Sequence, residues 1–520
     1  MTFDLKITGA EIFDGLGNPS RRADIGIQSD TITDIGDLSK APSRDEINAD
    51  GRYACPGFID AHTHSDAYVL IEPDARSKVF QGITTEVVGN CGASAAPLMG
   101  EYSLPADWRM HEYPGTWNSV AEYRSMVEEV NPAVNIVMLI GHNTLRAGVI
   151  GYESRPAAPD EMRRMCKVLE KSLDEGARGL STGLIYIPGM FAPGEEIEEL
   201  VRVVAGHEGI YTTHMRSESD ALLEAIDETL GCARLTGCRT QISHLKTSGS
   251  RNWHKINEVL DRIRSARGDG LDIAADRYPY TAACTDLDIV LPDWALKGNH
   301  ASILERVRNQ ETRKRIRKEL LQTRDPDYWD TVCIGSTHHS SNHRFKGMPL
   351  SEVADAMELD PVDAVLHIVD TDELHATGIF FCMSEENMWR ILDETFVMLG
   401  SDGSIHAPEG PLCRHHPHPR AYGSFPKYLR AVLEGHRTEL KEAIRKITSL
   451  PAERFRLHDR GVLMPGFSAD ITVFDPSTIR DTATFTEPHQ LSRGIDDLVV
   501  NGVVVMRDGR LTGNRAGRFL

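Results

Sequence analysis

Two histidines, His62 and His64, stand one residue apart directly after a short apolar run, in the stretch PGFIDAHTHSD. In a β-strand alternate side chains point to the same face, so both imidazoles would leave the end of such a strand on one side. Imidazoles that converge in this way are typical ligands of a metal ion. For an isolated pair, two hydrogen-bonded histidines at a polar strand end are the simpler interpretation. The rest of the chain must decide between them.

Other side chains that bind metals follow apolar, strand-like runs further along the chain. They are Cys91 in VVGNCGASAAP, His214 in YTTHMRSES, His244 in QISHLKTSG and Asp402 in MLGSDGS. Each alone has an ordinary explanation as a small buried thiol, a hydrogen-bonded imidazole or a turn. Imidazoles, a thiolate and a carboxylate at one site best suit zinc, with other divalent ions as alternatives.

The elements that must position these side chains alternate between strand-like and helical segments, which predicts an α/β fold. We expect eight strands, which end near His64, Asn90, His142, Gly183, Arg216, Lys246, Tyr280 and Asp402. Eight strand-then-helix units predict a (β/α)8 TIM-like barrel, in which the carboxyl ends of the strands build the active site on one face. Five of these strands would direct metal-binding side chains to one point.

The two ends of the chain have a different pattern. Residues 1–55 and 456–520 alternate apolar and polar residues and contain turn signals such as Asn501-Gly502. This pattern predicts short antiparallel strands, so we expect both ends to form one small β-sandwich domain. The barrel would then occupy residues 56–455, with a charged, helical insertion around residues 285–350.

Composition excludes several classes of function. The 520 residues include 57 Lys and Arg against 77 Asp and Glu, a formal net charge of −20, which argues against a nucleic-acid partner. The first residues do not resemble a secretory signal, and the apolar runs are too short to cross a bilayer, so we expect no membrane partner. Nine cysteines without a paired framework suit a reducing compartment, and we expect a cytoplasmic protein of undetermined oligomeric state.

The sequence resembles the amidohydrolase superfamily, and more closely its branch of N-acyl-D-amino-acid deacylases, the D-aminoacylases. The resemblance covers nearly the whole chain and includes PGFIDAHTH, VVGNCG, GLSTGLIY, THMRSE, ISHLK, DRYPYTA, GSDGS, HPRAYGSFP and GFSADITVFDP. Cys91 is its most specific element. Many cyclic-amide hydrolases of the superfamily use a carboxylated lysine to bridge two metals, whereas this branch has a cysteine in its metal site.

The resemblance implies roles for individual residues. The metal ligands would be His62, His64, Cys91, His214 and His244. Of these, Cys91, His214 and His244 resemble the set that holds one zinc ion tightly, and a second, weaker zinc at the other two histidines is left open. Asp402 would be the catalytic carboxylate and could also touch a second metal.

The resemblance also implies residues that bind the substrate. Arg420 in HPRAYGSFP matches the arginine that binds a carboxylate in this branch, and Tyr278 in RYPY matches its binding tyrosine. Lys246 stands two residues after His244 and would point a cation at the site if the strand continues. Without the resemblance, a salt bridge at the rim and a packed aromatic ring explain Lys246 and Tyr278. The histidines of CRHHPHPR (His415, His416 and His418) are interpreted as a rim loop outside the site.

The chemistry follows from this set of residues. A metal with an open position lowers the pKa of bound water to about 7 and polarises a carbonyl, and an adjacent carboxylate can pass the proton to a leaving nitrogen. We therefore expect a zinc-dependent hydrolase of N-acyl-D-amino acids that releases a carboxylate and a free D-amino acid. The alternatives are a hydrolase of cyclic amides such as hydantoins, disfavoured by Cys91, and a non-catalytic barrel, which should have lost ligands or Asp402.

The segment TAACTDLDIVLPDW, residues 281–294, bears on the substrate side chain, because in this branch it contributes to the side-chain pocket. It contains no Lys or Arg, and its apolar residues predict a preference for apolar side chains: Leu287, Ile289, Val290 and Leu291. Asp286 and Asp288 lie between them. If either faces the pocket, a basic or polar side chain would be preferred, but we expect both to point to solvent.

Overall fold

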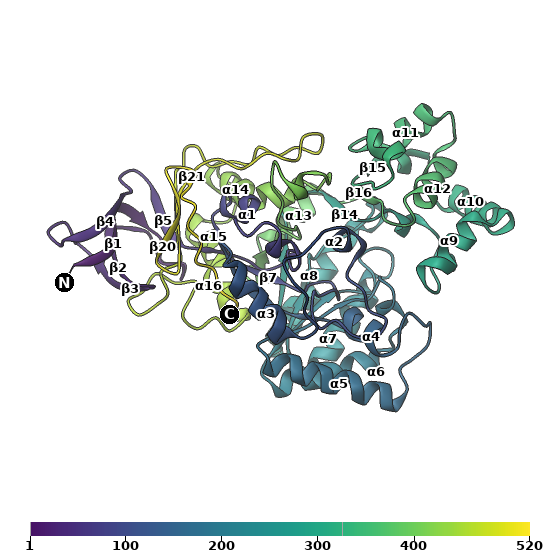
Figure 1. The fold of residues 1–520 in the computed structure, drawn as a ribbon, viewed down its shortest axis with the longest axis horizontal. Coiled ribbons are helices and arrows are strands. Elements are labelled where there is room, and N and C mark those ends of the chain that lie inside the picture. The colour runs from purple at the N-terminus through teal and green to yellow at the C-terminus, as the bar shows by residue number, and fades with distance from the viewer. Residues whose placement is uncertain (1, 325) are drawn as a thin grey trace.

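The computed structural model describes residues 2–324 and 326–520. In this part of the chain, parallel strands separated by helices follow one another in the order of a (β/α)8 barrel (Figure 1). The strands are β6 (Phe58–Asp60), β7 (Ile83–Val88), β8 (Asn135–Met138) with its continuation β9 (Ile140–Gly141), β10 (Gly179–Gly183), β11 (Ile210–His214), β12 (Arg239–Ile242), β13 (Ile273–Arg277) and β17 (Val397–Leu399). The predicted α/β class is confirmed.

Hydrogen bonding divides these strands into two sheets, ordered β6-β7-β8 and β9-β10-β11-β12-β13-β17. Leu139 links β8 to β9, so the chain itself passes from one sheet to the other. On the opposite side, the Ala61 N–H donates to the Leu399 carbonyl at 3.4 Å, and Thr63 pairs with Gly403 in an isolated parallel bridge. The strands therefore follow the barrel order without one continuous hydrogen-bonded ladder.

Amphipathic helices cover the outside of these strands. In α5 (Pro159–Asp174) the buried apolar residues recur at helical spacing: Met162, Met165, Leu169 and Leu173. The other helices around the strands are α1 (Arg76–Val79), α2 (Ala106–Arg109), α3 (Val120–Val130), α4 (His142–Val149), α6 (Gly194–Gly206), α7 (Leu222–Thr236), α8 (Ile256–Gly268), α13 (Glu385–Leu392), α14 (Arg420–Leu433), α15 (Leu440–Ile447) and α16 (Ser449–Arg454). None of the helices described here has the length and apolar character that a membrane span requires.

Strands from both ends of the chain join in one sheet beside the barrel (Figure 1). Its order is β21-β20-β19-β18-β5-β1-β2-β3, and β4 pairs with β1. The strands are β1 (Phe3–Ile12), β2 (Arg21–Gln28), β3 (Thr31–Gly36), β4 (Ser43–Asn48), β5 (Tyr53–Pro56), β18 (Ile471–Phe474), β19 (Ile495–Val500), β20 (Val503–Arg507) and β21 (Arg510–Leu511). The expected β-sandwich takes the form of one branched sheet, because β4 and β5 pair with different halves of β1.

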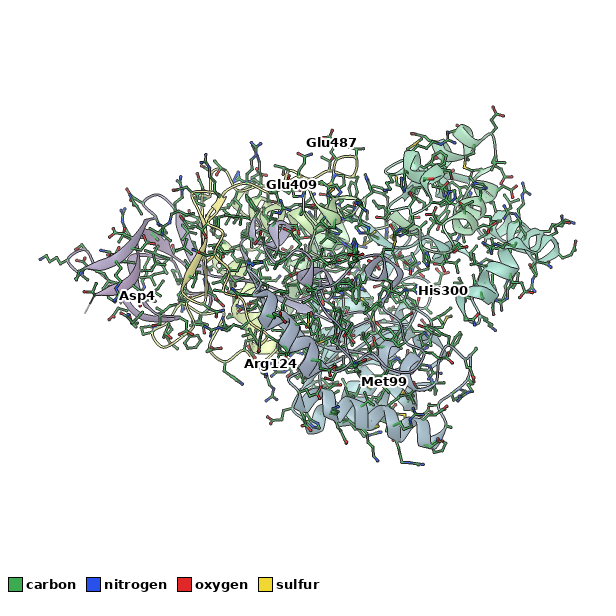
Figure 2. All side chains as sticks on the ribbon, viewed as in Figure 1. Asp4, Met99, Arg124, His300, Glu409 and Glu487 are labelled. Atoms are coloured by element: carbon green, nitrogen blue, oxygen red, sulfur yellow. The ribbon has the colours of Figure 1, made fainter. Side chains whose placement is uncertain are left out.

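A separate unit with its own core lies between β13 and β17, at the end of the molecule away from this sheet (Figure 1). Its antiparallel sheet has the order β14 (Ala282–Asp286), β16 (Thr377–Phe381), β15 (Val332–Ile334), and its helices are α9 (His300–Arg308), α10 (Gln310–Thr323), α11 (Leu350–Met357) and α12 (Pro361–Thr371). The unit extends to Phe381, beyond the expected limit at residue 350. His300 lies on its side toward the barrel (Figure 2).

Candidate metal centre and active site

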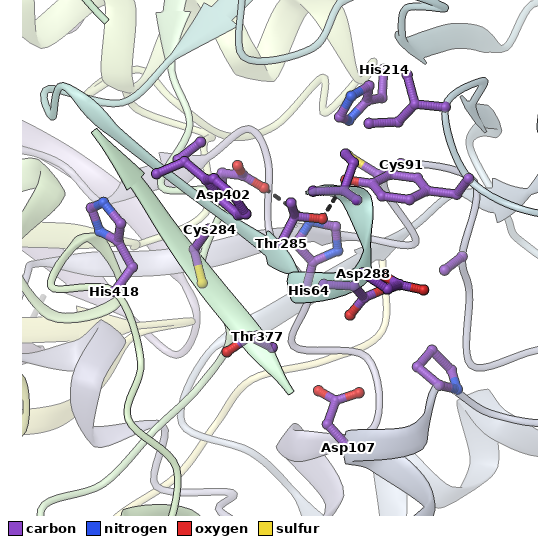
Figure 3. Close-up of a pocket in the computed structure, with 18 of the residues that line it drawn as sticks. His64, Cys91, Asp107, His214, Cys284, Thr285, Asp288, Thr377, Asp402 and His418 are labelled. Carbon is purple, nitrogen blue, oxygen red and sulfur yellow. Dashed lines mark hydrogen bonds and ion pairs between the residues drawn. The ribbon is translucent and has the colours of Figure 1, made fainter. Parts of the chain in front are cut away.

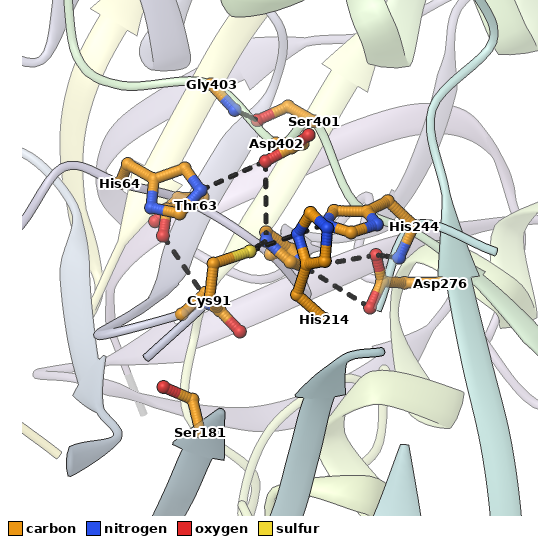
Figure 4. Close-up of polar contacts among 12 residues, drawn as sticks. Thr63, His64, Cys91, Ser181, His214, His244, Asp276, Ser401, Asp402 and Gly403 are labelled. Atoms are coloured by element: carbon orange, nitrogen blue, oxygen red, sulfur yellow. Dashed lines mark hydrogen bonds and ion pairs between the residues drawn. The ribbon is translucent and has the colours of Figure 1, made fainter. Parts of the chain in front are cut away.

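The predicted metal ligands come together at the carboxyl ends of the barrel strands (Figure 4). His214 ends β11, and the others follow β6, β7, β12 and β17 by two to four residues. Strand alternation does not align the first two histidines, because β6 ends at Asp60. Instead, the N–H and hydroxyl of Thr63 both donate to the Val87 carbonyl at 2.9 Å, which holds Thr63 against β7. His62 and His64 therefore share the side away from Thr63.

The ligand atoms form two groups that share one residue. The first contains His62, His64, Cys91 and Asp402, the second contains Cys91, His214 and His244, and within each group the atoms lie within 4.8 Å of one another. The Cys91 sulfur lies 3.3 Å from Nε2 of both His62 and His244. The geometry thus provides two adjacent metal positions with one thiolate between them.

The surroundings of the His214 ring show whether these residues fit a metal ion. Both of its ring nitrogens are buried and have no hydrogen-bond partner among the described residues. Burying polar atoms without partners is costly, and a metal ion removes this cost by accepting the lone pair of one nitrogen. Two imidazoles and a thiolate are also the donors that zinc prefers. The group Cys91, His214 and His244 therefore fits a zinc ion.

The backbone at this centre is held in an uncommon conformation. Cys91, His244 and Asp402 have φ angles of 51°, 34° and 51°, in the left-handed region that side-chain-bearing residues seldom adopt. Hydrogen bonds hold two of these turns: the Asp402 N–H donates to the His62 carbonyl at 2.8 Å, and the His244 N–H donates to Asp276 Oδ1 at 2.8 Å. The surrounding structure therefore fixes the direction of these ligand side chains.

Two carboxylates that the sequence analysis missed hold the ligand imidazoles. Asp276, on β13, places Oδ1 3.2 Å from Nδ1 of His62, and Glu218 places Oε1 2.8 Å from Nδ1 of His244. A carboxylate on the outer nitrogen of a ligand histidine fixes its tautomer and orientation. An aspartate inside the apolar, strand-like run IAADR was a usable signal for Asp276, because carboxylates are seldom buried without partners.

Charges at the centre favour ionised ligands. Burial raises the pKa of the Cys91 thiol, but the neighbouring imidazoles of His62 and His244 outweigh this effect and hold the pKa well below its usual value. Burial likewise raises the pKa of Asp402, and Arg420, His244 and His64 together hold it well below the usual range. These neighbours favour the thiolate form of Cys91 and the carboxylate form of Asp402.

Lys246 lies beside the metal ligands, although the reason expected for this was wrong. β12 ends at Ile242, so no continuous strand aligns Lys246 with His244. Its Nζ lies 2.7 Å from His244 Nδ1 and forms an ion pair with Glu218. The ammonium group thus belongs to the network that holds His244, and Lys246 also lines the cavity described below.

Arg420 and Tyr278 lie together next to Asp402. Arg420 Nη1 is 2.8 Å from Asp402 Oδ2, in an orientation that leaves this nitrogen without a hydrogen bond to the residues described. The guanidinium carbon lies 4.7 Å from the centre of the Tyr278 ring, and that of Arg277 lies 4.2 Å from the same ring centre. The hydroxyl of Tyr278 is buried and likewise has no partner in the described part of the chain. This corner offers unused donors to an anionic group.

One cavity of about 730 Å³ connects these residues to the unit between β13 and β17 (Figure 3). Its walls include ligands of the metal centre, Asp402, the residues expected to bind substrate, and residues of β14. His415, His416 and His418, interpreted as a rim loop outside the site, also line it. His418 accepts a hydrogen bond from the Arg420 N–H at 2.9 Å and thereby helps to place that arginine.

The expected apolar side-chain pocket requires correction. Leu287, Val290 and Leu291 are at most 2% exposed and pack in the core of the unit between β13 and β17. Of the apolar residues expected in the pocket, Ile289 lines the cavity, together with Asp286, which is exposed, and Asp288, which is half-buried in the wall and does not point freely to solvent as expected. The cause is the core of this unit, which takes up the leucines and leaves the residues between them on the cavity wall.

Comparison with known proteins agrees with this geometry. The amidohydrolase family matches residues 45–207 and 395–506. The N-acyl-D-glutamate deacylase and the D-aminoacylase of Alcaligenes xylosoxydans xylosoxydans are each 36% identical to the chain, over 99% and 100% of its length and 96% and 97% of theirs. The N-acyl-D-glutamate deacylase from Bordetella bronchiseptica, solved with zinc and a phosphonate mimic of the tetrahedral intermediate, is 35% identical over the whole of both chains, with a TM-score of 0.85.

Proteins that act on cyclic amides are more distant. The L-hydantoinase of Arthrobacter aurescens shares the fold with a TM-score of 0.58 at 17% identity, which shows a common architecture alone. The full-length identity and the family match over residues 45–207 and 395–506 agree with a metal centre built from His, Cys and Asp at the strand ends. The chain belongs to the amidohydrolase family.

Proposed function

We propose that the protein is a zinc-dependent hydrolase that cleaves the amide bond of N-acyl-D-amino acids and releases a carboxylate and a free D-amino acid. The observation that carries this proposal is the sharing of Cys91 by two groups of metal ligands, beside Asp402 and Arg420 in one cavity. Full-length relatives with this activity in their names support it. Cys91, shared by both groups of ligands, would have the bridging role that a carboxylated lysine has in many cyclic-amide hydrolases.

The protein's own residues account for the movement of the proton. A bound zinc ion supplies the Lewis acidity that polarises the amide carbonyl and activates water. Asp402, which is ionised and adjoins His64 at 3.0 Å, accepts a proton from the attacking water. It then gives this proton to the amide nitrogen as the carbon–nitrogen bond breaks. The O–H bond of water and the C–N bond break while C–O and N–H bonds form, and the acid's remaining proton passes to the amine, so the products are a carboxylate and an ammonium group.

Three cavity residues would bind the α-carboxylate of the substrate: Lys246, Tyr278 and Arg420. Arg420 and Tyr278 support this role through their unused donors, which lie next to the proposed base. An arginine fork can hold a carboxylate with two hydrogen bonds. Lys246, whose Nζ lies 2.7 Å from His244 Nδ1, adds a second positive charge to the site.

We propose further that residues 1–55 and 456–520 form one domain and residues 56–455 the barrel domain, because strands from both ends share one sheet. A cytoplasmic location is proposed from the nine cysteines, all of which are free thiols. The net charge of −20 supports the absence of a nucleic-acid partner.

A direct test combines metal analysis with a substrate panel. Purified protein should contain zinc and release free amine from N-acetyl-D-amino acids, with much slower release from the L-enantiomers. A zinc chelator should abolish the activity, and added zinc should restore it. Absence of amine release from every N-acetyl-D-amino acid in a zinc-loaded preparation would contradict the proposal, as would full activity after chelation.

A further inference from the structure

The cavity carries two neighbouring carboxylates that play no part in the metal centre. Asp286 ends β14, Asp288 lies in the following 3-10 turn (Leu287–Val290), and both side chains line the cavity. Figure 3 shows Asp288 on the cavity wall near Thr285. Within residues 2–324 and 326–520, neither forms a salt bridge with a cationic side chain. Asp286 is exposed to the cavity, and Asp288 is half-buried in its wall.

The packing of neighbouring apolar residues places these two aspartates at the cavity wall. Leu287 and Val290 are buried in the core of the surrounding unit at 0% and 1% exposure. The two residues between them in this 3-10 turn, Asp288 and Ile289, lie outside that core and line the cavity. The packing of Leu287 and Val290 thus fixes the backbone that carries the acidic pair at the cavity wall.

The pair lies close to the reaction centre. The hydroxyl of Tyr186 forms a hydrogen bond with Thr285 Oγ1 at 3.1 Å, and the Tyr186 ring packs edge-on against the ring of His214 at 5.0 Å. Thr285 directly precedes Asp286. One tyrosine therefore joins a metal ligand to the segment that carries the two carboxylates. Tyr278, whose buried hydroxyl has no partner among the described residues, lines the same cavity.

None of the Lys and Arg side chains described on the cavity wall forms a salt bridge with Asp286 or Asp288. Lys246 and Arg420 pair with Glu218 and Asp402, and Arg251 pairs with Asp220 at 2.6 Å. The other two cations of the wall are arginines with different neighbours. Arg324 lies over the ring of Tyr328 at 4.8 Å, and Arg109 lies near His300 and His375, where burial and the arginine charge lower both imidazole pKa values. Asp286 and Asp288 are therefore available to pair with a positively charged group of a ligand.

We propose that Asp286 and Asp288 bind the side chain of the substrate and select N-acyl-D-amino acids with a positively charged side chain, such as those of D-lysine, D-ornithine and D-arginine. This inference rests on the proposed function. A substrate held by its α-carboxylate near Arg420 and by its amide at the metal centre directs its side chain along the cavity wall. An ammonium or guanidinium group gives the two carboxylates the partner they lack, an apolar side chain buries them without one, and an acidic side chain is repelled.

The first test uses the unmodified, zinc-loaded enzyme. We expect kcat/KM to fall in the order N-acetyl-D-lysine, N-acetyl-D-norleucine, N-acetyl-D-glutamate, because norleucine keeps the lysine chain length and lacks the ammonium group. The expected gap between lysine and norleucine is about 10- to 100-fold, as for one hydrogen bond to a charged group. A norleucine or glutamate derivative cleaved faster than the lysine derivative would overturn the inference and leave the proposed function intact. Failure to cleave any of them would instead count against the proposed function.

Variants then assign the effect to the two carboxylates. The double substitution Asp286→Asn and Asp288→Asn keeps side-chain size, and we expect kcat/KM for N-acetyl-D-lysine to fall about 10- to 100-fold while that for N-acetyl-D-norleucine rises. Asp288→Lys should shift the preference towards N-acetyl-D-glutamate. The matched control is Asp293→Asn, an exposed aspartate of the same segment that does not line this cavity. An equal fall for lysine and norleucine derivatives in the double variant would overturn the inference, and if the variant fails to fold the substrate series still decides.

Discussion

At the scale of single residues, Cys91 determines the layout of the reaction centre because it belongs to both groups of metal ligands. His64 belongs only to one group, together with Asp402, and His214 only to the other. Removing a ligand from one group should therefore leave the other position largely complete. A single substitution can therefore remove the ion at one position and leave the ion at the other.

The first prediction compares His214→Ala with His64→Ala. We expect His214→Ala to lose most of its zinc and all of its activity, since only Cys91 and His244 remain in its group. His64→Ala should keep one zinc ion per chain. Zinc content after gel filtration, measured by atomic absorption, checks this outcome. Equal zinc loss in both variants would show that the two positions do not differ in this way.

The second prediction concerns Asp402. Asp402→Asn should lower kcat by about 10²- to 10⁴-fold, the range for loss of a general acid–base group. The ion held by Cys91, His214 and His244 should remain, because Asp402 is not in that group. Steady-state kinetics with parallel zinc analysis measure both effects. A kcat within a factor of a few of the wild-type value would assign the proton transfer to another group.

The third prediction concerns Glu218, whose carboxylate lies 2.8 Å from His244 Nδ1. Glu218→Gln keeps the shape of the side chain but removes its charge, so we expect zinc affinity to fall about 10- to 100-fold. Titration against a competing chelator measures this affinity. The control is Glu228→Gln, which affects the ion pair with Arg216 and no metal ligand. Unchanged affinity in Glu218→Gln would mean that the carboxylate does not hold the imidazole in place.

At the scale of secondary-structure elements, the junction between β6 and β17 depends on a buried lysine. Lys78 of α1 is fully buried, and its Nζ lies 3.0 Å from both Asp60 Oδ2 on β6 and Glu86 Oε1 on β7. It also donates to Ser401 Oγ at 3.0 Å and to the Gly403 carbonyl at 2.9 Å, on either side of Asp402. One ammonium group thus links the strands where their hydrogen-bonded ladder is interrupted.

The fourth prediction follows from this junction. Lys78→Met should lower the free energy of unfolding by about 3–5 kcal/mol, because the carboxylates of Asp60 and Glu86 would remain buried without their cation. It should also lower kcat, because the turn that carries Asp402 loses two of its hydrogen bonds. Urea denaturation measures the stability change. Lys171→Met, on the exposed face of α5, is the control and should change stability by less than about 0.5 kcal/mol.

The elements also show what the sequence could and could not predict. The strand ends and the ligands at them were predictable, because His, Cys and Asp are conspicuous directly after apolar runs. Glu218 was not, since a glutamate in the polar segment RSESD resembles an ordinary surface residue. The orientation of Leu287 and Asp288 was not predictable either. It depends on the core of the unit between β13 and β17, and residues distant in the sequence supply most of that core.

At the scale of the whole molecule, the net charge of −20 acts on every substrate that approaches the cavity. An N-acyl amino acid with an apolar side chain carries one negative charge, so the field of the protein opposes its entry. N-acetyl-D-lysine carries no net charge and is not opposed in this way. Salt screens such fields, and the screening length falls from about 30 Å at 0.01 M to about 8 Å at 0.15 M ionic strength.

The fifth prediction uses this screening. Raising ionic strength from 0.01 M to 0.15 M should lower KM for N-acetyl-D-norleucine by about a factor of two or more, and should change KM for N-acetyl-D-lysine less. Initial rates in buffers that differ only in added potassium chloride measure both values. A rise in KM for the norleucine derivative with added salt would mean that local cations such as Arg420, and not the overall charge, dominate its entry.

The pairing of β5 with β18 has a consequence for how the chain is made. β5 pairs with β18 antiparallel, from Pro56 opposite Ile471 to Tyr53 opposite Phe474, so the partner of an early strand is synthesised roughly 400 residues later. At about 5–20 residues per second, β5 waits about 20–80 s on the ribosome with one edge unpaired. An open strand edge can pair with other chains, so the nascent protein is exposed to mispairing during this interval. The sheet beside the barrel is completed only once synthesis has passed β18.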